Sequence, residues 1–352
     1  MNNWEGDMDF PDLLKGEILA KDLSRERNKS RRVKIQGWDD LIKVFDHFKK
    51  LDKIKKERWI FRGEKLSAIK EKESYDYEKN LVTKIEEVFD NFEIKDGRKR
   101  IKIENDLIRK FKRQIHQYMD ISESEIKNIG NCLSFMRHYG APTRFLDWTY
   151  SFFNAVYFAI NRFKKGSNYV VWAINDTWLT EKASKILCKK FEEKGNEDLR
   201  NKFKKYYCED KENFDFKNEE LFAKTFLRDN PIEFIHAYNP LKLHKRLVSQ
   251  RALFLCPGDI TKPFKDILTG MFEEDENNTN FFMIEITEDK DNEENKVDMK
   301  EILYKLYELD VIGSNIFPDL QGFAESLATY VAFPEILSPQ YEEFKELYKS
   351  CF

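Results

Sequence analysis

The run Tyr169–Ile174 constrains the fold more than any other part of this 352-residue chain. It reads Tyr-Val-Val-Trp-Ala-Ile, so apolar side chains fall on both alternating faces of a strand. A strand that is apolar on both faces is typical of the interior of a sheet, whereas a half-exposed strand alternates apolar and polar residues. The chain is therefore predicted to contain a sheet with this run as a central strand.

Five further segments have strand character and are predicted to join the same sheet. They lie near residues 33–35, 58–62, 232–236, 252–256 and 281–287. Helices are indicated between them by apolar residues at helical spacing, and we expect Asp39 or Asp40 near the N-cap of the first. We therefore predict an α+β fold in which a mixed β-sheet is flanked by helices.

The domain organisation follows from where charge is concentrated. Two Lys- and Glu-rich stretches, residues 64–130 and 177–230, are predicted to be charged helical insertions at the edge of the sheet. Residues 1–30 are expected to form a charged N-terminal arm, and residues 336–352 a C-terminal helix. No internal repeat or low-complexity linker divides the remainder, so residues 31–335 are predicted to form one elaborated domain.

Composition excludes several classes of protein. The chain has 61 Lys and Arg against 64 Asp and Glu, a net charge of -3, so it has no overall positive field to hold a polyanion. Its five cysteines are scattered without a C-x-x-C pair, which argues against a disulfide framework or a zinc ribbon and favours a reducing cytosol. The N-terminus has no apolar run, and no run of about 18 apolar residues occurs, so we expect a cytoplasmic protein without a signal peptide or a membrane span.

Common catalytic motifs are also missing. No P-loop, dinucleotide-binding, zinc-protease or nucleophile-elbow pattern is present. The five histidines are mostly isolated, and no metal site is predicted.

The first chemically suggestive feature is Phe61-Arg62-Gly63, at the end of the predicted strand 58–62. A buried Arg is costly unless it is paired. Its planar guanidinium suits a phosphate or carboxylate, and Gly63 allows a ligand or a backbone to come close. Two interpretations stay open: Arg62 binds the anion of a ligand, or it forms a structural ion pair with an internal carboxylate such as Asp147.

The second feature is the segment 138–149, which reads His-Tyr-Gly-Ala-Pro-Thr-Arg-Phe-Leu-Asp-Trp-Thr. A helix is predicted to end at its start, a Pro turn follows, and Thr143–Thr149 is expected to open the next helix. The segment gathers side chains capable of chemistry, namely His138, Tyr139, Thr143, Arg144 and Asp147. Such density favours a functional site over a polar corner that only joins two helices.

These two segments resemble the FRG domain, a family named after its Phe-Arg-Gly motif. The second hallmark of that family is similar to residues 138–149. The resemblance continues over Asn154–Ala159, over the Arg-x-x-x-Gln-x-x-x-Phe spacing of Arg246–Phe254, and over Ile316–Gly322. It covers about residues 33–330, with Ala141 and Ala252 as minor departures.

The resemblance implies a bacterial or phage protein, and some family members resemble effectors of anti-phage or toxin systems. We accordingly expect an effector in bacterial defence whose pocket binds a phosphate-bearing ligand, a nucleotide or NAD. Arg62, Gly63, Thr143, Arg144 and Gln250 are the expected ligand-binding residues. His138, Tyr139, Asp147 and Glu285 are the expected catalytic residues.

Three functions stay open, and the expectation leans to the first, a transferase acting on NAD. An ADP-ribosyltransferase-like enzyme would hold NAD through Arg62 and orient the nicotinamide ribose with a carboxylate, Glu285 or Glu233. A nuclease-like effector acting on nucleic acid would use His138 as general base, Asp147 to orient it and Arg144 to hold phosphate. A non-catalytic module would sense a nucleotide or a protein partner.

One spatial prediction is common to all three functions. Polar residues that adjoin buried apolar segments must satisfy one another or a ligand. We therefore expect one concave pocket to be lined by the following residues: Arg62, His138, Tyr139, Arg144, Asp147 and Gln250.

Overall fold

A computed structural model gives the fold of residues 31–66, 80–164, 167–192, 201, 219–240, 244–272, 279–287 and 298–332. The predicted N-terminal arm at 1–30 and the predicted C-terminal helix at 336–352 lie outside these residues. So do parts of both predicted insertions.

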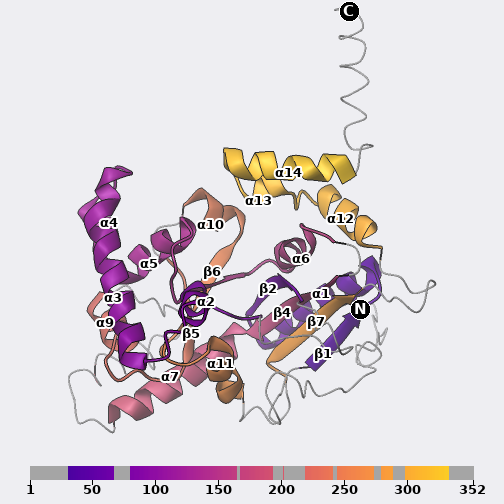
Figure 1. Ribbon diagram of the computed structural model, residues 1–352. Coiled ribbons are helices and arrows are strands. Elements are labelled where there is room, and N and C mark those ends of the chain that lie inside the picture. The colour runs from indigo at the N-terminus through magenta and orange to yellow at the C-terminus, as the bar shows by residue number, and fades with distance from the viewer. Residues whose placement is uncertain are drawn as a thin grey trace, which may run out of the picture.

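Seven strands form a single mixed sheet, shown in Figure 1. They are β1 (Arg31–Ile35), β2 (Trp59–Lys65), β3 (Leu146–Thr149), β4 (Asn168–Asn175), β5 (Ile235–Tyr238), β6 (Ala252–Pro257) and β7 (Phe281–Thr287). Their order is β1-β7-β4-β2-β3-β6-β5, in which β1 and β7 are parallel and all other neighbours are antiparallel. The predicted α+β fold with a mixed sheet is confirmed, and all six predicted strands lie in the sheet.

Strand β4 is the central strand that its composition predicts. It pairs along its length with β2 on one side and with β7 on the other. Alternate side chains enter two separate cores: Tyr169 and Val171 contribute to one, and Val170 and Trp172 to the other. All four side chains are fully buried.

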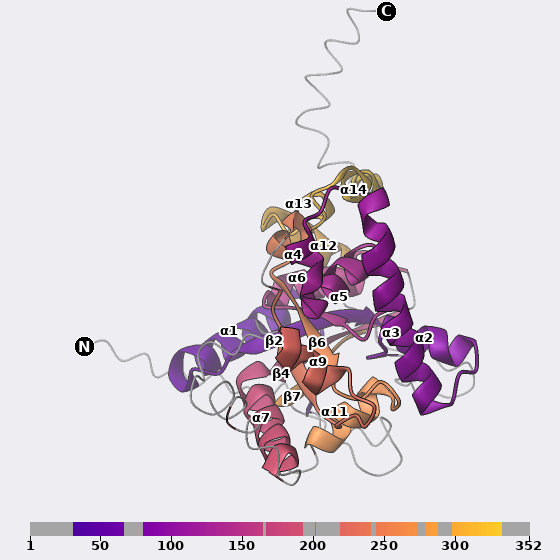
Figure 2. The same ribbon diagram turned by 90° about the vertical axis from the view of Figure 1, so that its left-hand side faces the viewer.

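Helices cover both faces of the sheet. The core that contains Val171 is closed by α1 (Trp38–Lys55), α6 (Phe152–Ile160) and α12 (Met299–Glu308). The core that contains Trp172 is closed by α3 (Gly97–Gln114), α5 (Ile129–His138), α7 (Asp176–Glu192), α9 (Glu219–Phe226) and α11 (Phe264–Phe272). Figure 2 shows the sheet between α7 and α11 on one side and α6 and α12 on the other.

The remaining elements are short or peripheral. They are α2 (Lys84–Asn91), the 3-10 turn η3 (Ile115–Gln117), α4 (Glu123–Lys127), α10 (Lys245–Ser249), α13 (Gly313–Ile316) and α14 (Leu320–Ala332). No helix among the described residues is both long and apolar enough to cross a membrane.

Two details differ from the predictions. Residues 146–149 form strand β3 and do not open a helix, because they pair with β6 over four positions. Strand β5 begins at Ile235, where its pairing with Pro257 starts, and not at residue 232. At the start of α1 the N-cap is Gly37, and Asp39 and Asp40 lie near it in the first turn, as expected. The Asp40 carboxylate accepts a hydrogen bond from the Gln36 backbone, 3.0 Å away.

The segment 177–230 was predicted to lie at the edge of the sheet, but its helices also contribute to the core. Leu179 and Leu187 of α7, and Phe222 and Phe226 of α9, are buried in the core beneath Trp172. The apolar faces of these two helices are therefore part of the main core.

Candidate functional site

A cavity of about 420 Å³ opens where β2 and β3 separate. These strands pair at a single position, Phe61 with Thr149, so beyond it their backbones no longer bond to each other. The walls come from β2, the end of α5, β3, α6, α10, the start of β6 and the residue after α13. The volume lies within the range of small-molecule sites.

Arg62 spans the gap between the two strands. Its Nη1 donates to the carbonyl oxygen of Asp147 at 2.7 Å. Its Nε and Nη2 both donate to Oε1 of Glu64, at 2.9 and 2.7 Å. Arg62 thus lies at the cavity wall, but its charge is neutralised by Glu64. The ligand-binding interpretation needs the guanidinium charge to be left for the anion of a ligand.

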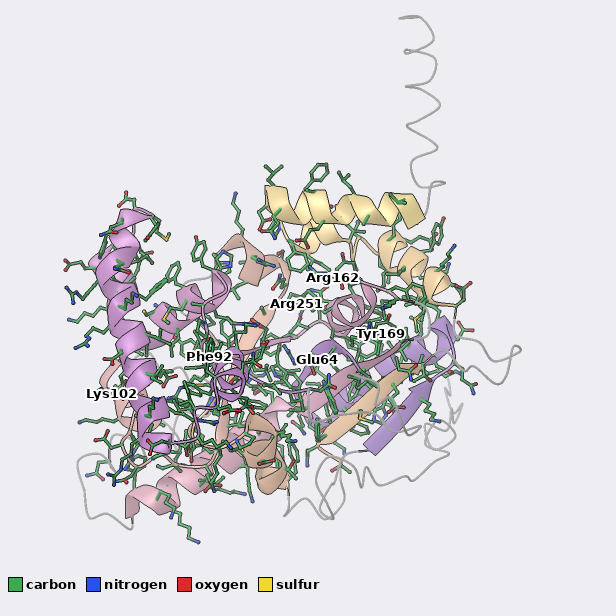
Figure 3. The ribbon with its side chains drawn as sticks, viewed as in Figure 1. Glu64, Phe92, Lys102, Arg162, Tyr169 and Arg251 are labelled. Atoms are coloured by element: carbon green, nitrogen blue, oxygen red, sulfur yellow. The ribbon has the colours of Figure 1, made fainter. Side chains whose placement is uncertain are left out.

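Glu64 accepts hydrogen bonds from four residues in three segments of the chain. Besides Arg62, its second oxygen accepts from the Trp172 indole at 3.0 Å and from the Leu81 backbone and the Asn80 amide, each at 3.2 Å. Figure 3 labels Glu64 near the middle of the view, and its side chain is 14% exposed. Arg62 therefore forms a structural ion pair, as the second interpretation has it, but its partner is Glu64 and not the Asp147 carboxylate.

Gly63 is required by helix packing. A Cβ at this position would lie 1.8 Å from the carbonyl oxygen of Ala155 and 2.6 Å from the backbone nitrogen of Ala159. Both atoms belong to α6, so Gly63 allows this helix to lie directly on β2. The close approach that the sequence suggested is made by the protein's own backbone.

Asp147 is held by Arg137, a residue that the sequence argument did not single out. The Arg137 guanidinium donates through Nε and Nη2 to one oxygen of Asp147. Burial alone would raise the pKa of Asp147, but the paired Arg137 and the nearby Arg62 hold it below the ordinary value. Asp147 is therefore ionised at neutral pH, and its side-chain partner is Arg137 and not His138.

Two histidines lie against each other at the mouth of the cavity. The rings of His138, at the end of α5, and His244, at the start of α10, are 3.7 Å apart between centroids. Burial and the charge of Arg246 lower the pKa of His138. Burial, His138 and Arg246 lower the pKa of His244 to about 4. Both imidazoles are therefore mainly neutral at neutral pH.

Arg246 is the least compensated charge of the cavity. It forms no ion pair with any residue that the structure describes, and its guanidinium lies 4.4 Å from the centre of the Phe317 ring. Its half-buried side chain lines the cavity together with that of Gln250. The Gln250 backbone is fixed by Thr149, whose Oγ1 donates to its carbonyl oxygen at 2.7 Å.

The indole of Trp148 supplies a further polar group. Trp148 is 2% exposed and lines the cavity, and its Nε1 has no hydrogen-bond acceptor among the described residues. A buried donor without a partner is uncommon in folded proteins, and this one is closed off from solvent as well.

Arg144, expected to hold phosphate, lies elsewhere. It is 2% exposed, and its guanidinium pairs with Glu104 of α3 and donates to the carbonyl oxygens of Phe226 and Pro257, at 2.8 and 2.9 Å. These bonds occupy every nitrogen of the guanidinium. Arg144 is a structural connection, and the expectation that it faces a ligand is wrong.

The other expected site residues outside the cavity are Thr143, Tyr139, Glu285 and Glu233. Thr143 is fully buried, and the exposed Tyr139 ring lies over His138 but faces a separate apolar groove beside α3. Glu285 is fully buried in β7, opposite Val170 and Lys34. Glu233 pairs at the surface with Lys262, at 2.6 Å.

The predicted convergence is therefore partly correct. Arg62, His138, Asp147 and Gln250 line one cavity, whereas Tyr139 and Arg144 do not. Among the described residues no group of three or more His, Cys, Asp and Glu side chains could hold a metal ion.

Three titratable cavity residues, Arg137, His244 and Arg246, were missing from the predicted site. Arg246 carried a usable signal, because it opens the Arg-x-x-x-Gln-x-x-x-Phe spacing whose members Arg246, Gln250 and Phe254 all line the cavity. Arg137 directly precedes the His-Tyr-Gly motif. His244 had no signal in the sequence beyond its residue type.

Comparison with known families supports the resemblance. Residues 57–168 match the family model of the FRG domain, so the chain carries an FRG domain. No curated protein and no solved structure matches the chain. The matched region supplies β2, α5, β3 and α6 to the cavity, and the segments 244–254 and 317 complete it from outside the match.

Proposed function

We propose that the cavity binds a phosphate-bearing ligand of nucleotide size and that Arg246 binds its phosphate. The observation that carries this proposal is the charge arrangement. Arg62 and Arg137 are each neutralised by a carboxylate, whereas Arg246 forms no ion pair among the described residues, and the nearby Glu325 carboxylate acts on it from beyond ion-pair distance. A guanidinium is well suited to two parallel hydrogen bonds with phosphate oxygens.

The other wall residues suit an anion of this class. The Gln250 amide can donate to phosphate or base atoms. The aromatic rings of Trp148, Phe158 and Phe317 offer apolar surface for a base or a ribose. The cavity thus combines an apolar wall with a few polar groups, as small-molecule sites commonly do.

The histidine pair supports proton transfer at the bound ligand. A mainly neutral imidazole can accept a proton at neutral pH, and His138 lines the cavity next to His244. His138 is the proposed general base, removing a proton from a hydroxyl or a water that attacks the phosphorus. The leaving oxygen is then protonated by solvent or by the imidazolium formed at His138.

These features favour a nuclease-like or phosphodiesterase-like reaction over ADP-ribosyl transfer. The carboxylates proposed for the transferase, Glu285 and Glu233, lie outside the cavity, and those near it are paired with arginines. Both reactions act on a phosphate-bearing ligand, so the binding proposal does not depend on the choice between them.

The binding proposal is tested by calorimetric titration with AMP, ADP-ribose, NAD and a short single-stranded RNA. Charge-assisted hydrogen bonds contribute about 1.5–3 kcal/mol, so Arg246→Ala should weaken binding by about 10- to 100-fold. The matched control is Arg109→Ala, which removes an exposed arginine of α3. Equal affinity of wild type and Arg246→Ala, or no binding of any of these ligands, would overturn the proposal.

Product analysis by mass spectrometry separates the reactions. Nicotinamide release from NAD would establish transferase or glycohydrolase chemistry, and shortened RNA would establish a nuclease. Binding without any product would establish a sensor. For a reaction that depends on proton transfer, His138→Gln should abolish product formation while ligand affinity changes little.

The proposed role in bacterial defence has its own test. Expression of the wild-type chain in a bacterial host should slow growth, and His138→Gln and Arg246→Ala should each relieve the effect at equal protein level. These two variants are better suited than changes at Arg62, because Arg62 also holds β2 and β3 together. Equal growth with wild type and both variants would remove the support for a toxic enzyme.

A further inference from the structure

Helix α14 presents its apolar stripe to solvent. The side chains of Leu320, Phe323, Leu327 and Val331 are 82%, 50%, 45% and 83% exposed. Ala324 and Ala328 are exposed between them. These positions follow the spacing i, i+3, i+4, i+7, i+8 and i+11, which marks the buried face of an amphipathic helix. In Figures 1 and 2, α14 lies at the outer edge of the molecule, beyond α6.

The inner face of the same helix is made of small residues. A Cβ at Gly322 would lie 2.2 Å from Phe317, and a Cβ at Gly313 of α13 would lie 2.7 Å from the Cβ of Ser326. Gly322 and Ser326 are both buried. Helix α14 thus packs on the protein through close backbone contact and leaves its large apolar side chains outside.

The exposed face carries almost no charge. Glu325 is the one charged residue between 320 and 332, in a chain of which 36% is charged. Its carboxylate accepts hydrogen bonds from Arg162, just after the end of α6, at 3.2 Å, and from Gln321, at 3.0 Å. Figure 3 shows Arg162 between α6 and α14, which Figure 1 labels in the same view. A continuous apolar face of this kind on an otherwise charged surface marks an interaction site.

The order of large and small residues along the stripe is complementary to its own reversed order. Reversing the helix about the midpoint between Glu325 and Ser326 exchanges Leu320 with Val331. It also exchanges Phe323 with Ala328 and Ala324 with Leu327. Two antiparallel copies of α14 would therefore place a large side chain opposite a small one at both inner pairs, while Leu320 and Val331 meet at the ends.

We infer that α14 forms a twofold symmetric contact with α14 of a second copy of this chain. A twofold contact requires a surface complementary to itself, and the reversed order of the stripe meets this requirement. Alternating large and small residues let two helices interdigitate. Phe317, which precedes α14, lines the cavity, so the contact would fix the helix beside one cavity wall. The inference is independent of what the cavity binds.

Sedimentation equilibrium of the full chain tests the inference. The wild type should show a concentration-dependent equilibrium of monomer and dimer. Leu327→Glu should give monomer at the same concentrations, because the dimer would bury two carboxylates at its centre. The control is Ile54→Glu, which alters an exposed apolar residue of α1, 67% exposed, and should leave the dimer intact. A wild type that stays monomeric at every concentration, or a dimer that survives Leu327→Glu, overturns the inference.

Exchange of the inner residues tests the register. Leu327→Ala leaves Ala opposite Ala and should weaken dimerisation by about tenfold or more. Ala324→Leu places Leu opposite Leu and should also weaken it. The double variant Ala324→Leu/Leu327→Ala restores one large residue opposite one small residue and should recover most of the affinity. A double variant as weak as the poorer single variant would rule out the antiparallel register.

Discussion

At the scale of single residues, Arg62 connects β2 and β3 next to the one position at which these strands pair. It is 18% exposed, and its partner Glu64 is 14% exposed, so the ion pair is shielded from water on most sides. Its third hydrogen bond, to the carbonyl oxygen of Asp147, connects it to β3. The family motif at this position therefore contributes first to the shape of the cavity.

Arg62→Ala is expected to destabilise the protein with or without ligand. Removing one member of a buried ion pair leaves a desolvated charge, which typically costs about 3–5 kcal/mol. The loss here should fall at or below the lower end, because Glu64 keeps its bonds to Trp172, Asn80 and Leu81. Urea denaturation measures it, and Arg62→Ala/Glu64→Gln should recover part of the loss. Unchanged stability of Arg62→Ala would show that Glu64 does not depend on this pair.

His138 and His244 should both titrate below the ordinary pKa of histidine. For His244 the pKa falls from 6.5 to about 4, so its contribution to stability is complete above pH 6.5 and is lost as the pH falls toward 4. NMR of the imidazole C–H resonances measures both pKa values. A bound phosphate should raise them by favouring the charged rings. A His244 pKa near 6.5 in the free protein would contradict the packing described for this pair.

Glu86 gives the opposite pH dependence. It completes the capping box of α2 with Thr83 and also accepts a hydrogen bond from the Phe264 backbone, at 3.2 Å, at the start of α11. Burial raises the pKa of Glu86 from 4.5 to about 7. A raised carboxyl pKa contributes stability below pH 4.5 that is lost as the pH rises through 7.

Glu86→Gln should therefore stabilise the protein at pH 8 by up to about 3 kcal/mol, since each pKa unit corresponds to about 1.4 kcal/mol. The amide oxygen can still accept both backbone hydrogen bonds. At pH 4 the variant and the wild type should melt together. Thermal melts across this range provide the measurement, and a variant less stable than wild type at pH 8 would contradict the raised pKa.

At the scale of elements, the sequence predicts those helices and strands whose formation depends on the local pattern of apolar residues. Strand β4 could be identified because six consecutive residues are apolar. Strand β3 could not, since four residues between a Pro turn and a helix have no period of their own. Its structure is fixed by β6, more than a hundred residues later. For α14 the period predicts a helix but does not show which face meets the protein.

The contact of α6 with β2 gives a prediction at this scale. Gly63→Ala would force the two backbones apart, because the new Cβ meets the Ala155 carbonyl at 1.8 Å. Overpacking costs about 1–3 kcal/mol when side chains can adjust, and backbone atoms adjust less, so the loss should reach or exceed the upper value.

Gly270→Ala is the matched control. It lies in α11 with no atom within 4 Å of the added Cβ, and replacing a helical glycine should stabilise by about 0.5–1 kcal/mol. Chemical denaturation of both variants should therefore give shifts of opposite sign. A Gly63→Ala protein as stable as Gly270→Ala would show that α6 does not rest on β2 as closely as described.

At the scale of the whole molecule, residues far apart in the chain meet at one cavity. The segments that resemble the FRG family, from Phe61 to Phe317, all contribute side chains to its wall. The rule that buried polar groups must find partners correctly brings Arg62, His138, Asp147 and Gln250 together. This rule does not predict which partner each of these residues binds. Glu64 lies two residues from Arg62 on the same face of a strand, a spacing that could have identified it. Glu104, the partner of Arg144, could be identified only from the folded chain.

Arg144 connects three distant parts of the molecule, and its removal should affect all of them. It bonds to α3 through Glu104, to the end of α9 through the Phe226 carbonyl and to the end of β6 through the Pro257 carbonyl. Arg144→Ala would leave the Glu104 carboxylate, 2% exposed, without a counter-charge. Such a loss typically costs about 3–5 kcal/mol, a large part of the about 5–15 kcal/mol that stabilises a folded domain.

Urea denaturation followed by tryptophan fluorescence and by far-ultraviolet circular dichroism tests this role. In the wild type the two signals should change together, because α3, α9 and β6 are joined by one buried group. In Arg144→Ala the midpoint should fall further than in Arg62→Ala, since the Arg62 pair is less buried. The double variant Arg144→Met/Glu104→Gln removes both charges and should regain part of the loss, while Arg109→Ala should resemble wild type. If Arg144→Ala keeps the wild-type midpoint, or if the double variant is no more stable than the single one, the ion pair does not hold these elements together.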